Sequence, residues 1–127
     1  MIADDQHAYV TLRSGNTCAG FTNQLDVIDI DSLSSPKLVK TYPMTNPHGL
    51  SKDGTMLFIC DGTSGVKVYN AADPNKLQLI KTISGIDTYD VIAYNNIALV
   101  VAKDGVYQYS YSDVNDIKLL SKITLTK

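Results

Sequence analysis

Few side chains of this 127-residue chain are of types that could do chemistry, and one histidine–aspartate combination stands out. His48 is one of two histidines, and an imidazole titrates near neutral pH, so His48 could act as a base or as a metal ligand. Asp90 aligns with it in an internal repeat and could complete an acid–base pair. In the competing interpretation, which we favour, each side chain fixes a loop by hydrogen bonding or faces solvent.

Motifs for other kinds of chemistry are absent from the sequence. It contains no H-x-H or H-E-x-x-H metal motif, no calcium-binding loop, no G-x-S-x-G elbow, no P-loop and no G-x-G-x-x-G. We therefore predict no metal, no cofactor and no catalytic residue. Asp26, Asp29 and Asp31 are expected on the solvated side of a strand and its turn, not around a cation.

The two cysteines give little information about redox compartment. Cys18 follows Arg13 in a Gly-rich polar loop, where the guanidinium could lower the pKa of the thiol, but no histidine lies near it in sequence. Cys60 ends an apolar run and is expected to be a small buried hydrophobic residue. A disulfide between Cys18 and Cys60 is the less favoured alternative.

Charge and hydropathy exclude two classes of partner. The net charge of −2, with Lys and Asp interspersed, provides no basic stripe for nucleic acid. The longest apolar run, residues 97–102, is far shorter than the roughly 20 residues that a membrane-spanning helix needs. The sequence MIADDQH at the start lacks the basic and apolar regions of a signal peptide.

The strongest feature of the chain is an internal repeat with steps of 41 and 40 residues. LVK at position 38 recurs as LIK at 79 and LLS at 119, and LDVIDI at 25 recurs as VKVYNA at 66 and VYQYSY at 106. A third element reads AYVT at 8, LFIC at 57 and LVVA at 99. A fourth precedes the later two units, where we align Leu50 with Ile92.

These short segments are rich in β-branched and aromatic residues, and Gly, Asn and Asp-Pro turn signals separate them. The pattern predicts an all-β fold of β-propeller blades, each a four-stranded antiparallel meander with strands A to D. We expect one domain of about three blades, near residues 1–45, 46–87 and 88–127, forming an incomplete propeller that begins inside strand A of its first blade.

In such a meander the D–A and B–C connections lie on one face of the propeller. That face would also carry the long segment 12–24, which is an insertion relative to the later units. It gathers the candidate binding residues Arg13, Asn16, His48, Asp61, Tyr89, Asp90, Lys103 and Asp104.

The sequence LDVIDIDSLSSPKLVK, residues 25–40, resembles the unit of the LVIVD-repeat family of β-propellers. Residues 25–29 match its strand, residues 36–39 match its Pro and "KLV", and residues 8–10 also fit, while the later units depart from the pattern. The resemblance implies a bacterial secreted or envelope-attached protein, often a lipoprotein, without an assigned reaction. An extracytoplasmic location is therefore expected from the resemblance alone.

We predict a non-catalytic binding or scaffold module that recognises a protein or a glycan through the loop face. The alternatives are an enzyme or metal-dependent site at the propeller axis, built from His48, Tyr89, Asp90 and Asp104, and a fragment without a separate function. Open blade faces and strand edges also predict self-association or the presence of further blades, and two three-blade units would approach a six-bladed ring.

Overall fold

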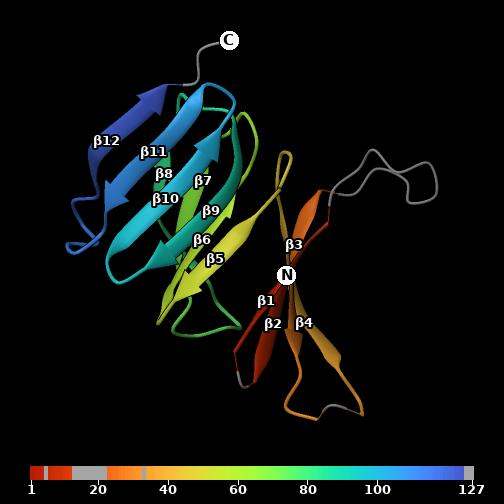
Figure 1. Ribbon diagram of the computed structural model, residues 1–127. Helices are drawn as coiled ribbons and strands as arrows, with labels where there is room; N and C mark the ends of the chain where they lie inside the picture. The colour runs from red at the N-terminus through yellow and green to blue at the C-terminus, as the bar shows by residue number, and fades with distance from the viewer. Residues whose placement is uncertain (5, 13–22, 33, 125–127) are drawn as a thin grey trace.

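The computed structural model describes residues 1–4, 6–12, 23–32 and 34–124 (Figure 1). These residues form strands and no helix, which confirms the predicted all-β fold, and hence none of them forms a helix that could span a membrane. The strands are Ile2–Ala3 (β1), His7–Leu12 (β2), Gln24–Asp29 (β3), Lys37–Pro43 (β4), Leu50–Asp53 (β5), Met56–Cys60 (β6), Val66–Asn70 (β7), Gln78–Ile83 (β8), Thr88–Tyr94 (β9), Ile97–Ala102 (β10), Gly105–Ser110 (β11) and Lys118–Thr124 (β12).

The strands form three four-stranded antiparallel sheets, and none of the sheets closes on itself. Each is a simple meander in chain order: β1–β4 is the first blade, β5–β8 the second and β9–β12 the third. Strands β5 and β6 of the second blade lie against β9 of the third, and β1 lies near β5. This is the arrangement of propeller-like blades in an incomplete ring.

The repeat extends to irregularities that the strand pattern alone would not require. A β-bulge interrupts the pairing of the third and fourth strands at Val27, Val68 and Gln108, again 41 and 40 residues apart. After each bulge, the side chain that ends the third strand accepts a hydrogen bond from the backbone N–H two residues later: Asp29 at 2.9 Å, Asn70 at 2.9 Å and Ser110 at 3.4 Å. The interpretation of Asp29 as a turn residue is confirmed.

The sequence alignment of the first two strands of the third unit with those of the second is wrong by one residue. Asp53 pairs with Met56, and Tyr94 pairs with Ile97, so the two hairpins are 41 residues apart and Leu50 corresponds to Val91, not to Ile92. Successive side chains of a strand point to opposite faces, so one residue decides burial: Val91 is 2% exposed and Ile92 is 62% exposed. The error arose because β6 is apolar at every position, which removes the alternation that would have set the register.

The hydrophobic core lies between the blades. Tyr9, Leu25 and Val27 of the first blade pack in one cluster with Leu57 and Ile59 of the second. The opposite face of the second blade forms a second cluster with the third blade, and its buried members include Phe58, Val66, Val68, Val100, Tyr107 and Tyr109. Every residue of β6 is buried because the middle blade has a neighbour on both faces.

Hydrogen bonds of two tyrosine hydroxyl groups also link successive blades. The Tyr42 hydroxyl accepts a bond from the Leu77 N–H at 2.9 Å, and the Tyr111 hydroxyl donates to Asp53 at 2.6 Å. The Tyr9 hydroxyl is different, because it is buried and has no hydrogen-bond partner among the described residues.

Replacing Tyr9 with Phe is therefore expected to raise the free energy of unfolding by about 1 kcal/mol, since a buried hydroxyl without a partner costs roughly 1–3 kcal/mol. Tyr111→Phe is the matched comparison: it leaves the Asp53 carboxylate without its donor and should lower stability by about 1–2 kcal/mol. Urea denaturation followed by circular dichroism measures both values. A Tyr9→Phe protein less stable than the wild type would contradict the expectation.

Candidate functional site at the loop face

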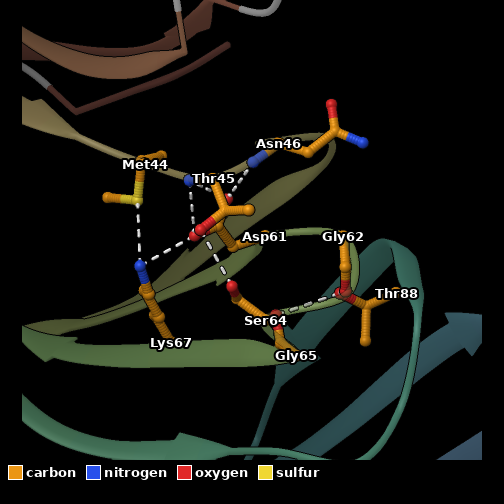
Figure 2. Close-up of polar contacts among 9 residues, drawn as sticks. All are labelled: Met44, Thr45, Asn46, Asp61, Gly62, Ser64, Gly65, Lys67 and Thr88. Carbon is orange, nitrogen blue, oxygen red and sulfur yellow. Dashed lines mark hydrogen bonds and ion pairs between the residues drawn. The ribbon is translucent and has the colours of Figure 1, made fainter.

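The turn formed by residues 61–65, between β6 and β7, holds together the face that carries the D–A and B–C connections (Figure 2). At its start is Asp61, whose side chain is fully buried. Its carboxylate accepts hydrogen bonds from the Thr45 N–H, at 3.0 and 3.1 Å to its two oxygens, and from the Asn46 N–H at 2.7 Å. The Lys67 Nζ lies 2.7 Å from Asp61 Oδ2. The carboxylate thus ties the connection from β4 to β5 onto the second blade.

Burial by itself would raise the pKa of Asp61. The hydrogen bond from Lys67 and the two backbone N–H donors outweigh that effect, so the pKa is lower than that of an ordinary aspartate. Asp61 is therefore an anion at neutral pH. The cost of burying its charge is offset by donors that surround it, which is the condition under which a buried ion pair is tolerated.

The other side of the same turn is linked to the third blade through Thr88, which is fully buried at the start of β9. Its N–H donates to the Gly62 carbonyl at 2.9 Å, and its hydroxyl donates to the Gly65 carbonyl at 3.0 Å. Gly65 has a φ of +83°, and a Cβ there would lie 1.9 Å from the Ile83 carbonyl oxygen, so only glycine fits. One five-residue turn therefore links the approach to the second blade with the first strand of the third.

Next to this turn, the segment just before β5 and the start of β9 bring His48, Tyr89 and Asp90 together. The His48 N–H donates to the Cys60 carbonyl at 2.7 Å, and the Gly49 N–H donates to the Tyr89 carbonyl at 2.9 Å. The rings of His48 and Tyr89 meet edge to face with centroids 5.7 Å apart. The carboxylate of Asp90 lies so close to Gly49 that a Cβ there would be 2.0 Å from its Oδ1.

Polar groups around this cluster have defined partners. The His48 Nε2 lies 3.2 Å from the Asn46 amide nitrogen, and Asp90 Oδ1 accepts the Val91 N–H at 2.9 Å. The Tyr89 side chain is 41% exposed, Asp90 is exposed, and His48 is half-buried. We name the surface formed by His48, Tyr89 and Asp90 the rim. It combines an aromatic pair with an accessible carboxylate on a backbone that hydrogen bonds hold in place.

The candidate residues from the sequence thus separate into groups. His48, Tyr89 and Asp90 lie together, although His48 and Asp90 are not equivalent in the repeat: the corrected register aligns His48 with Tyr89. Asp61 lies beneath the surface and supports it. Lys103 and Asp104 form the tight turn between β10 and β11, whereas Arg13 and Asn16, like Cys18, lie outside the described residues.

Asp104 belongs to a small exposed cluster of its own. Its carboxylate accepts hydrogen bonds from Lys122 at 3.0 Å and from the Tyr107 hydroxyl at 2.9 and 3.0 Å, and these bonds lower its pKa. The Lys122 Nζ also lies 4.9 Å from the centre of the Tyr107 ring. Lys103 contributes a backbone bond from its N–H to the Asp87 carbonyl at 2.9 Å.

The roles in the site of Lys67, Thr88 and the backbone N–H groups of Thr45 and Asn46 were not identified from the sequence. In the sequence, Lys67 resembles an ordinary exposed residue of the alternating strand VKVYN. In the structure its side chain forms an ion pair with Asp61. The donors are peptide groups, which carry no residue-type signal. Only the Gly-rich composition of the turn indicated a special backbone there.

Among the described residues, no group of three or more His, Cys, Asp or Glu side chains is placed to hold a metal ion. No protein-family model matches the sequence, and a search of curated proteins finds no significant relative. The resemblance to LVIVD repeats therefore stays a prediction.

Replacing Asp61 with Asn is expected to lower the free energy of unfolding at pH 7 by about 3 kcal/mol, because breaking a buried ion pair costs about 3–5 kcal/mol and the amide keeps part of the hydrogen bonding. The folded-state pKa of Asp61 is lowered, so its charge stabilises the fold above the unfolded pKa of about 3.9. That stabilisation is lost as the pH falls through the folded-state pKa. The difference in free energy of unfolding between wild type and variant should be largest near pH 7 and should decrease below about pH 4.

Denaturant unfolding from pH 3 to pH 8 measures this dependence. Asp104→Asn is the matched control, because its ion pair is exposed and should leave stability nearly unchanged. Equal stability losses in the two variants at pH 7 would show that Asp61 does not hold the blades together.

Cys60 is a buried free thiol, and its burial raises its pKa to about 12. Because the thiolate is the reactive form, we expect iodoacetamide at pH 8 to leave Cys60 unmodified in the folded protein and to alkylate it in urea. Peptide mass spectrometry follows Cys60 separately from Cys18. Rapid labelling of Cys60 without denaturant would contradict the buried position.

Proposed function

We propose that this chain is a non-catalytic binding module of an extracytoplasmic, LVIVD-like β-propeller protein, and that it recognises a protein or a glycan through the rim of the loop face. The observation that carries the proposal is the meeting of His48, Tyr89 and Asp90 on a backbone tied down from two sides by the turn at residues 61–65. The extracytoplasmic location rests on the resemblance of residues 25–40.

Rigidity of the rim supports a binding role. The connection that leads to His48 is held by the Asp61 carboxylate, and β9, which carries Tyr89, begins at the buried Thr88. A surface that is already ordered loses little conformational entropy when a ligand binds, and this increases affinity without new contacts. Binding residues are often carried on loops that a scaffold of regular structure positions.

Of the two ligand classes, protein and glycan, the chemistry of the rim favours a glycan. A tyrosine ring offers an apolar face together with a polar hydroxyl, and Tyr89 is accessible at 41% exposure. A carboxylate group such as that of Asp90 accepts hydrogen bonds from hydroxyl groups. A sugar ring, with C–H groups on one face and hydroxyls at its edge, matches both features.

An acid–base or metal-dependent site at the axis is the second candidate. It is favoured by the closeness of Asp90 to Gly49, which places a carboxylate next to the residue that follows His48. It requires that His48 and Asp90 act as a pair on one reacting group or one ion. Elemental analysis of the wild type and of a His48→Ala, Asp90→Ala variant discriminates the metal form of this function.

The binding proposal is tested with the fluorescently labelled 127-residue chain on an array of bacterial envelope glycans. We expect Tyr89→Ala and Asp90→Asn each to weaken binding about tenfold, which corresponds to about 1.4 kcal/mol for one lost contact. Tyr94→Ala is the matched control, since Tyr94 is an exposed tyrosine at the opposite end of β9.

Glycan binding that survives both rim substitutions would overturn the assignment of the rim as the binding surface. A chain that binds no glycan on the array would exclude the glycan class and leave a protein ligand, for which the same three variants apply.

A further inference from the structure

Each blade has two different faces, and the same strand positions build each face in all three blades. We call the face toward the next blade in the chain the leading face and the face toward the preceding blade the trailing face. In the second blade the leading face includes Met56, Phe58, Cys60, Val66, Val68, Ile80 and Ile83, which pack against the third blade. Its trailing face consists of Leu57, Ile59, Tyr69, Ala71 and Leu77, which pack against the first blade.

The leading face of the third blade is apolar but uncovered. The strand register gives its residues by steps of 41 and 40: Ile97, Leu99, Val101, Val106, Leu120 and Ile123. Leu99 and Val101 are each 41% exposed, Leu120 is 53% exposed and Ile123 is 65% exposed. The equivalent Phe58 and Cys60 are 1% and 0% exposed. A contiguous apolar patch of this kind marks an interaction surface.

One position departs from the pattern. Gln108 of the third blade occupies the place of the buried Val68 in the second, so this leading face has a polar group near its centre. A glutamine can be buried in an interface when its amide is hydrogen-bonded, whereas it stays solvated in an open sheet. The remaining positions are apolar, so the face keeps the character of a blade contact.

A matching trailing face exists at the other end of the molecule. The corresponding residues of the first blade are Ala8, Val10, Ile28, Ile30 and Pro36. All five are apolar, as are their equivalents in the third blade, Ala98, Val100, Tyr109, Tyr111 and Ile117, which are buried against the second blade. No described blade precedes the first, and Val10, Ile28 and Ile30 remain partly exposed.

We infer that the leading face of the third blade packs against the trailing face of the first blade of a second copy. The contact continues the two blade–blade interfaces already present in the chain, with the same strand positions on both sides. The first and third blades lie at opposite ends of the stack in Figure 1, so both surfaces are available at once. Two copies make six blades, within the range of about 4–8 blades found in closed propellers.

The inferred contact is heterologous, because two different surfaces meet, and it closes when the second copy returns its own leading face to the first. A closed dimer buries both apolar faces and leaves neither for further growth. This inference does not depend on the ligand of the rim, because the rim lies on the loop face and the contact uses the sides of the sheets.

The mass of the 127-residue chain in solution, measured by light scattering after size exclusion, tests the contact. We expect twice the 13.8 kDa mass of one chain for the wild type. Leu120→Glu should give 13.8 kDa, because a charge in the leading face blocks both contacts of the dimer. Leu79→Glu is the matched control: Leu79 is 54% exposed, on β8 and outside the two contacting faces, and this variant should stay dimeric.

A substitution on the opposite surface distinguishes the head-to-tail arrangement from a symmetric one. Ile28→Lys alters only the trailing face of the first blade and should also give a monomer. An equimolar mixture of Leu120→Glu and Ile28→Lys retains one unaltered contact and should regain the dimeric mass. Far-UV circular dichroism and a cooperative thermal transition establish that each variant is folded, and Val10→Lys replaces Ile28→Lys if the latter is not.

Three results would overturn the inference: a monomeric wild type, a mass that grows beyond two chains with concentration, or a folded trailing-face variant that remains dimeric. The last of these would indicate that two leading faces meet each other.

Discussion

The structure depends on the burial of both faces of each sheet. A four-stranded sheet with apolar side chains on one face and polar ones on the other can lie at a protein surface, but these sheets are apolar on both faces. The middle strand β6 shows the consequence, because all five of its residues are buried between two neighbouring blades. Stacking of blades is therefore the source of the core, and no blade has a core of its own.

Polar links set how the stacked sheets are oriented. Hydrophobic contact between flat faces tolerates sliding, whereas hydrogen bonds require particular atoms to meet. Tyr111 of the third blade bonds to Asp53 of the second, and Tyr42 of the first blade bonds to the Leu77 backbone of the second. At the loop face, Asp61 of the turn at residues 61–65 binds the connection from β4, and Thr88 binds the other side of the same turn. These bonds fix the positions of the loops on this face, and the rim is part of them.

Much of the fold could be predicted from local pattern and repetition. The strands, the connections and the turn role of Asp29 follow from side-chain preferences that act within a few residues, and repetition in three units strengthened each of them. The sequence correctly placed His48, Tyr89 and Asp90 on one face of the blades. It wrongly made His48 and Asp90 equivalent in the repeat, because the alignment was shifted by one residue. The role of Asp61 could not be predicted, because its donors are peptide groups 15 and 16 residues away and a lysine on the next strand.

By itself the sequence determined the number of repeating units, the order of their strands and the apolar character of both sheet faces. Those properties depend on residue types and on their spacing along the chain, both of which are present in the sequence itself. The tertiary structure alone decided which aspartate is buried and which apolar face stays open, because burial depends on neighbours distant in sequence. Leu99 and Phe58 illustrate the difference: they occupy equivalent positions and are both large apolar residues, yet only Phe58 has a blade in front of it.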